Sequence, residues 1–86
     1  MNNKQYEEYL LSILTYCESL ESPTDIKDNE ENPFGLSCYD FREMVLGLNR
    51  NHYINAIPYL GGVILYSLTF EGREKLEKLR EKLSNR

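Results

Sequence analysis

One stretch, residues 35–49, constrains the fold of this chain more than any other. Ser37 is a good N-cap, and Asp40 three residues later comes close to completing a capping box. Four apolar residues then follow at the spacing i, i+3, i+4 and i+7, which marks one face of a helix: Phe41, Met44, Val45 and Leu48. Asn49, Asn51 and His52 tolerate the left-handed conformation that ends helices. The stretch therefore predicts one amphipathic helix with a defined start and end.

The residues after this helix predict a β-hairpin and a second helix. Residues 53–57 are aromatic and β-branched and indicate a strand, and residues 63–68 indicate another. Residues 58–62 contain Pro58 and a Gly-Gly pair, which is typical of a turn. Thr69 is suited to cap a C-terminal helix over about 70–84.

The first part of the chain predicts a helix and an acidic connection. Apolar residues recur at helical spacing from about Lys4 to Leu20, and Pro23 cannot continue that helix. Thr24 is suited to start a single helical turn that Ile26 anchors, and an acidic loop over residues 27–34 follows. The alternative is that all of residues 22–34 are irregular.

A capped helix that runs into a hairpin is the central pattern of a winged helix-turn-helix domain. We therefore expect an α+β fold over a single domain, residues 1–86, with three helices, a two-stranded wing and a C-terminal helix.

Two motifs carry a resemblance to known families. The sequence Leu68-Thr69-x-x-Gly72 at the end of the second strand resembles the wing-to-helix junction of PadR-type and MarR-type repressors. The order Gly35-Leu36-Ser37, Phe41, Leu48 and His52-Tyr53-Ile54 is similar to the YjcQ-like winged-helix proteins of bacteria and their prophages, which have a glycine where His52 stands. The resemblance covers about residues 4–83. It implies a DNA-binding fold, often dimeric, and supplies no catalytic residues.

The charge distribution opposes a simple DNA-binding assignment. The chain has a net charge of −4 and a pI of about 4.9, whereas nucleic-acid binders usually show a basic surface. From Glu18 to Glu31 six acidic residues face one basic residue, a net charge of −5. From Glu71 to Arg86 six basic residues face four acidic ones, a net charge of +2.

Motifs for chemistry are missing from the sequence. Cys17 and Cys38 lie far apart without metal-site spacing and predict free thiols, and His52 is the single histidine. No phosphate-binding glycine loop, paired-carboxylate pattern or metal-ligand spacing occurs. No apolar run approaches the roughly 20 residues of a membrane span, and no signal peptide is evident. We expect a cytoplasmic, non-enzymatic protein without a cofactor or metal and without a membrane partner.

The solvent face of the central helix is the first candidate site. Tyr39, Arg42 and Arg50 are the candidate DNA contacts, because Arg42 could read guanine and Arg50 could bind phosphate. Glu43 on the same face repels phosphate. An ordinary solvated or protein-contacting surface is an equal alternative.

The wing tip and the last helix are candidate protein interfaces. The tip has no Lys or Arg, and Tyr59 and Leu60 are suited to anchor a protein partner, unless they fold back onto the domain. The stripe of Leu76, Leu79 and Leu83 predicts a homodimer seam, with packing onto the first helix as the alternative.

Two functional hypotheses follow. The first is a dimeric winged-helix transcription regulator that binds double-stranded DNA. The second is a prophage accessory or inhibitor module that binds a host or phage protein without binding DNA.

Overall fold

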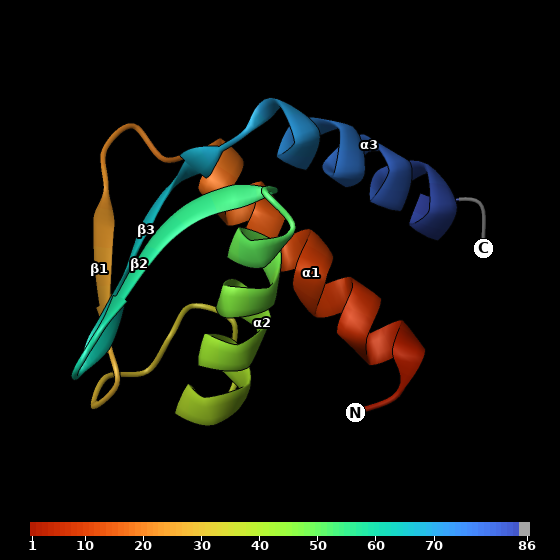
Figure 1. The fold of residues 1–86 in the computed structure, drawn as a ribbon. Helices are drawn as coiled ribbons and strands as arrows, with labels where there is room; N and C mark the ends of the chain where they lie inside the picture. Colours follow the sequence, from red (N-terminus) through yellow and green to blue (C-terminus); the bar gives the residue numbers. More distant parts are fainter. Residues whose placement is uncertain (85–86) are drawn as a thin grey trace.

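The computed structural model describes residues 1–84 as three helices and a three-stranded antiparallel sheet (Figure 1). The elements in chain order are α1 (Asn3–Glu18), β1 (Thr24–Lys27), α2 (Cys38–Arg50), β2 (Ile54–Tyr59), β3 (Gly62–Leu68) and α3 (Phe70–Ser84). The α+β class is confirmed. The described residues form one helix fewer than the sequence predicted, because the short helix predicted after Pro23 does not form.

The strand β1 stands in place of that helical turn, and the prediction for residues 24–28 was wrong. β1 pairs antiparallel with β3, with Asp25 opposite Ile64 and Ile26 opposite Val63. Ile26 does anchor the segment, since it is buried, but as the inward residue of a strand. The partner strand lies almost forty residues away in the sequence, so local composition could not reveal the pairing.

The sheet order is β1-β3-β2, so β3 is the central strand. The β2–β3 turn is tighter than predicted and consists of Leu60 and Gly61, where Gly61 has a φ of 109°. Pro58 belongs to β2 rather than to the turn, and it is tolerated there because β2 is an edge strand.

The three helices lie on one side of the sheet, and the core fills the space between them (Figure 1). The largest fully buried side chains come from all three helices and from β2 and β3: Ile13, Leu14, Cys17, Val45, Ile54, Val63, Leu65 and Leu76. α1 contacts both α3 and β3, and α2 contacts β2. The opposite face of the sheet has no helix over it within the described residues.

The C-terminal leucine stripe belongs largely to this core. Leu76 and Leu79 are buried within one chain, and Leu83 is half-buried. Two ion pairs also join α3 to α1, with Nη2 of Arg80 2.9 Å from Glu18 and Nζ of Lys82 2.6 Å from Glu7. Leu76 and Leu79 therefore pack inside the domain, as the alternative of packing onto the first helix predicted. They are not available as a dimer seam.

The predicted start of α2 is confirmed. The Asp40 backbone N–H donates to Oγ of Ser37 at 3.1 Å, as expected of an N-cap. After α2, His52 adopts a left-handed backbone with a φ of 62°, a conformation that a glycine adopts more readily.

The junction between β3 and α3 explains the Leu-Thr-x-x-Gly motif physically. Thr69 caps α3, since its Oγ1 accepts from the Gly72 N–H at 3.0 Å. The Thr69 hydroxyl donates to the His52 carbonyl, and the Thr69 N–H donates to the Tyr53 carbonyl at 3.1 Å. A Cβ at Gly72 would lie 1.9 Å from that Tyr53 oxygen. Only glycine fits where the start of α3 meets the start of β2.

The connection between β1 and α2 contains no helix within the described residues, so the second helix expected before α2 is missing there. The backbone of this connection is held by Asn32, a buried polar residue that the sequence did not single out. The Asn32 side chain donates to the Leu36 carbonyl at 2.7 Å and accepts from the backbone N–H groups of Phe34 and Leu36 at 3.1 Å. The Phe34 ring packs against Phe41, so an apolar contact takes the place of the second helix.

Both cysteines are free thiols, as predicted: Cys17 is buried and Cys38 is exposed. Among residues 1–84, no helix combines the length and the apolar character that crossing a membrane requires.

Candidate functional site

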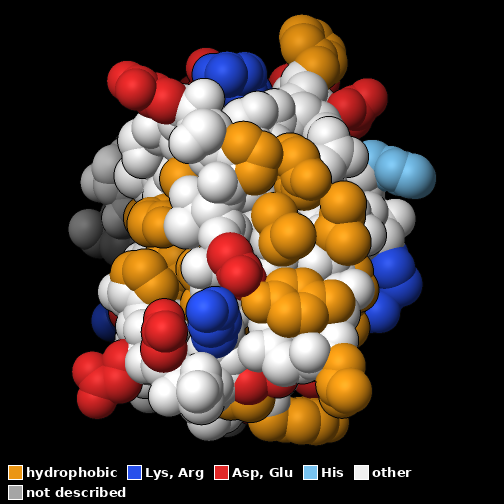
Figure 2. All heavy atoms as spheres, turned by 90° about the vertical axis from the view of Figure 1, so that its left-hand side faces the viewer, with side chains coloured by type: hydrophobic (Ala, Val, Ile, Leu, Met, Phe, Trp, Pro, Cys, Tyr) orange, Lys and Arg blue, Asp and Glu red, His pale blue; other side chains and the backbone are white. Residues whose placement is uncertain are grey.

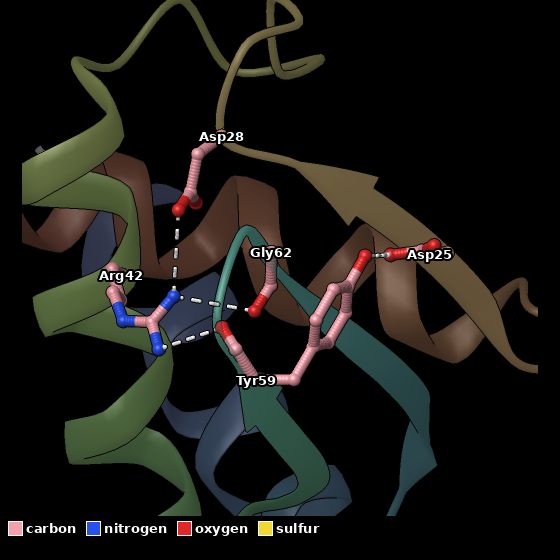
Figure 3. A network of polar contacts seen from close by, with 5 residues as sticks. All are labelled: Asp25, Asp28, Arg42, Tyr59 and Gly62. Atoms are coloured by element: carbon pink, nitrogen blue, oxygen red, sulfur yellow. Dashed lines mark hydrogen bonds and ion pairs between the residues drawn. The ribbon is translucent and has the colours of Figure 1, made fainter.

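Arg42 of α2 is committed to contacts inside the molecule (Figure 3). Its Nη1 donates to the Gly62 carbonyl at 3.2 Å, and its Nη2 donates to the Tyr59 carbonyl at 3.1 Å. Nη1 also lies 3.7 Å from Oδ2 of Asp28. The side chain is 31% exposed. Arg42 therefore connects α2 to both strands of the hairpin at its turn and to the start of the acidic loop.

Tyr59 crosses the sheet from β2 to β1 (Figure 3). Its hydroxyl donates to Oδ1 of Asp25 at 2.5 Å. This hydrogen bond, followed by desolvation and the nearby carboxylates of Asp25, Asp28 and Glu30, raises the pKa of Tyr59 to about 12. The phenol hence stays protonated at neutral pH and remains a donor to the carboxylate.

The Tyr59 ring can take this path because Gly62 lies beneath it. A Cβ at Gly62 would come within 2.6 Å of the Tyr59 hydroxyl oxygen and 2.8 Å of the Ile26 carbonyl oxygen. The second glycine of the Gly-Gly pair is therefore needed for close approach rather than for its φ.

Leu60 is the most exposed large apolar residue of the described chain, at 102%. Tyr59 and Gly62 on either side of the turn are both held by Arg42, which fixes the position of the tip. Tyr39 is 71% exposed and lies one turn before Arg42 on α2, so it is on the same side of that helix. We call Leu60 and Tyr39 the apolar end of the molecule.

The uncovered face of the sheet is also apolar. Val63 and Leu65 are buried, so Ile64 and Tyr66, which alternate with them in β3, point to the opposite face. Ile57 is directly opposite Ile64 in β2 and is 52% exposed. Figure 2 shows hydrophobic side chains gathered over the middle of this side of the molecule, with charged side chains among and around them. We call Ile57, Tyr59, Ile64 and Tyr66 the outer sheet face.

The structure separates the predicted site residues into three groups. Arg42 contacts Tyr59 beside the β2–β3 turn that carries Leu60, and Tyr39 is one helical turn before Arg42 on α2. Arg50 is exposed at the other end of α2, about 12 Å along the axis from Arg42. Leu76, Leu79 and Leu83 lie on α3, as described above.

The sequence reading missed the role of Asp25 and the outer sheet face. The alternation of Ile64 and Tyr66 with Val63 and Leu65 was the available signal for the face. No signal was available for Asp25, because its contact with Tyr59 depends on a strand that was not predicted. Among the described residues no three His, Cys, Asp or Glu side chains lie together so as to hold a metal ion.

Comparison with known proteins identifies no relative. No protein-family model, no curated protein and no solved structure matches this chain.

Proposed function

We propose that this chain is a protein-interaction module that binds a partner protein through its apolar end. The exposure of Leu60 carries this proposal. A leucine held at the tip of a fixed turn is an anchor of the kind that fills a pocket on a partner, and the exposed Tyr39 lies one helical turn from the Arg42 that holds this turn. Burying such a side chain on binding is worth about 1.5–3 kcal/mol.

The order of elements is compatible with a winged helix that lacks its second helix, and we propose that relationship for the fold. The hairpin β2–β3 would be the wing. Its turn, Leu60-Gly61, has no cation, and the whole hairpin from Ile54 to Leu68 has no Lys or Arg. A wing of that composition favours a protein surface over phosphates.

The contacts that Arg42 makes inside the molecule also support a protein partner rather than DNA. To reach a base edge, Arg42 would have to give up two carbonyl acceptors and the Asp28 carboxylate. The exposed residues of α2 include Asp40 and Glu43, which repel a phosphate backbone. Arg50 and Tyr39 are exposed and remain the candidate DNA contacts of the regulator hypothesis. DNA titration distinguishes the two functions.

The test is affinity capture from the cells that express this chain, followed by reconstitution with the purified partner. Leu60→Asp should weaken binding of that partner at least about tenfold, because it removes the anchor and places a charge in an apolar pocket. Phe70→Asp is the matched control, since Phe70 is 74% exposed and begins α3 just after the far end of β3, roughly 20 Å from the turn.

The two variants also define the failure of the proposal. A partner that binds Leu60→Asp as tightly as the unchanged protein does not use the apolar end. Equal losses from Leu60→Asp and Phe70→Asp would likewise refute an anchor at the turn.

A further inference from the structure

The outer sheet face is a second apolar surface, separate from the apolar end but joined to it through Tyr59. A sheet in a folded domain is ordinarily covered on its apolar faces by another layer. Here α1, α2 and α3 all lie on the other side (Figure 1). Ile57 and Ile64 face each other across β2 and β3, and Ile57 is half exposed. No element among residues 1–84 covers them.

The dimensions of this face match one helix. Neighbouring strands are about 4.8 Å apart, so the outer strands β1 and β2 are separated by roughly 10 Å. An α-helix with its side chains is about 10–12 Å across. A single helix laid on β3 would therefore contact all three strands.

The border of the face is acidic. Residues 21–31, which contain β1, include five acidic residues and one basic residue, all six exposed, and one of the acidic residues, Asp28, is paired with Arg42 of α2. These are Glu21, Asp25, Lys27, Asp28, Glu30 and Glu31. Asp25 lies in the same row as Ile64 and Ile57 across the sheet. One oxygen of its carboxylate accepts from Tyr59, so the charge is held beside the apolar row.

This combination of shape and charge selects the occupant. A second copy of this chain would bring another acidic border against the first, and like charges across an interface oppose binding. Nucleic acid is repelled for the same reason. A helix with an apolar face and a row of Lys or Arg satisfies both the apolar row and its acidic border.

We infer that the outer sheet face binds a basic amphipathic helix of a partner protein. This inference rests on the proposed function, because it takes the partner to be a protein, and it adds the chemistry of the segment that docks. The apolar residues of the helix cover Ile57, Ile64 and Tyr66, and its basic residues lie over β1 and the acidic loop.

The test uses the whole chain with labelled isoleucine methyl groups and a synthetic helical peptide of about 18 residues, with leucine on one face and lysine on the other. We expect the methyl signals of Ile57 and Ile64 to shift as peptide is added and to stop shifting when the site is saturated. A matched peptide with glutamate in place of every lysine should leave those signals unchanged.

Two variants of equal charge complete the design. Ile57→Lys should weaken binding of the lysine peptide at least about tenfold. Tyr6→Lys, at a similarly exposed residue of α1 behind the sheet, should change it less than about twofold. Circular dichroism of both variants confirms that they remain folded.

Several results would overturn the inference: no binding of the lysine peptide, equal binding of the glutamate peptide, or an unchanged shift of the Ile64 methyl signals in Ile57→Lys. Concentration-dependent dimerisation that Ile57→Lys abolishes would identify a second copy as the occupant instead. These failures are distinct from failure of the proposed function, which is measured at Leu60 with the captured partner.

Discussion

Replacing Arg42 tests whether this residue is a structural connection or a ligand-binding group. Arg42→Ala removes two hydrogen bonds to carbonyls and one ion pair with Asp28. A hydrogen bond from a charged donor contributes about 1.5–3 kcal/mol, and we take about 1 kcal/mol for each because the guanidinium is a third exposed. The solvent-exposed ion pair adds at most about 0.5 kcal/mol. The expected loss in free energy of unfolding is therefore about 2 kcal/mol.

Urea denaturation followed by circular dichroism measures this loss directly. For a chain of this size, about 2 kcal/mol corresponds to a fall of roughly 8–16 °C in Tm. Arg42→Lys keeps the charge but can serve only one carbonyl well, so it should lose about half as much. The matched control is Arg50→Ala at the exposed end of α2, which should cost no more than about 0.5 kcal/mol through the helix dipole.

The outcome that would refute this reasoning is equal and small destabilisation by Arg42→Ala and Arg50→Ala. Arg42 would then contribute no more than an ordinary surface arginine and would be free for a ligand. The contacts of Arg42 would then no longer support a protein-binding function.

Three further predictions concern backbone fit and titration. Gly72→Ala should destabilise the fold by about 3 kcal/mol or more in urea denaturation, because the new Cβ meets the Tyr53 carbonyl oxygen. A Cβ at Gly47 in α2 would make only an ordinary contact, 3.8 Å from Nη2 of Arg50, so Gly47→Ala should gain up to about 1 kcal/mol. His52→Gly should stabilise by about 0.5 kcal/mol, since it relieves a left-handed backbone at some cost in chain entropy, and thermal melts would show a lower Tm if this is wrong. Burial raises the pKa of the Cys17 thiol from 9.0 to about 11, so its contribution to stability is complete below pH 9.0 and is lost as the pH rises through 11. A Cys17→Ala variant should lose this pH dependence in denaturation curves recorded across that range.

The elements that local sequence determines were predictable. The start of α2 rests on Ser37 and a four-residue apolar stripe, and both are confirmed. The hairpin and the capping role of Thr69 were also predictable, because turn and cap residues act on neighbours in the sequence. The exact turn was two residues rather than five, since Pro58 can occupy an edge strand.

The elements that depend on distant pairing were not predictable. β1 contains Thr24, Asp25 and Lys27 around a single buried isoleucine, and it becomes a strand only because β3 offers its free edge. The roles of Arg42 and Asp25 follow from that same strand and turn, so they were missed together. An exposed arginine on a helix face and an arginine bound to two carbonyls look the same in sequence.

Titration of labelled random-sequence duplex DNA at low ionic strength, followed by fluorescence anisotropy, tests the central claim most directly. Nonspecific DNA binders typically have dissociation constants of about 1–100 μM, and they bind more weakly as salt rises. We predict no saturable binding up to about 100 μM protein. Low-micromolar binding that weakens steeply with salt and is lost in Arg50→Ala would contradict a protein-interaction function and would favour the DNA-binding regulator.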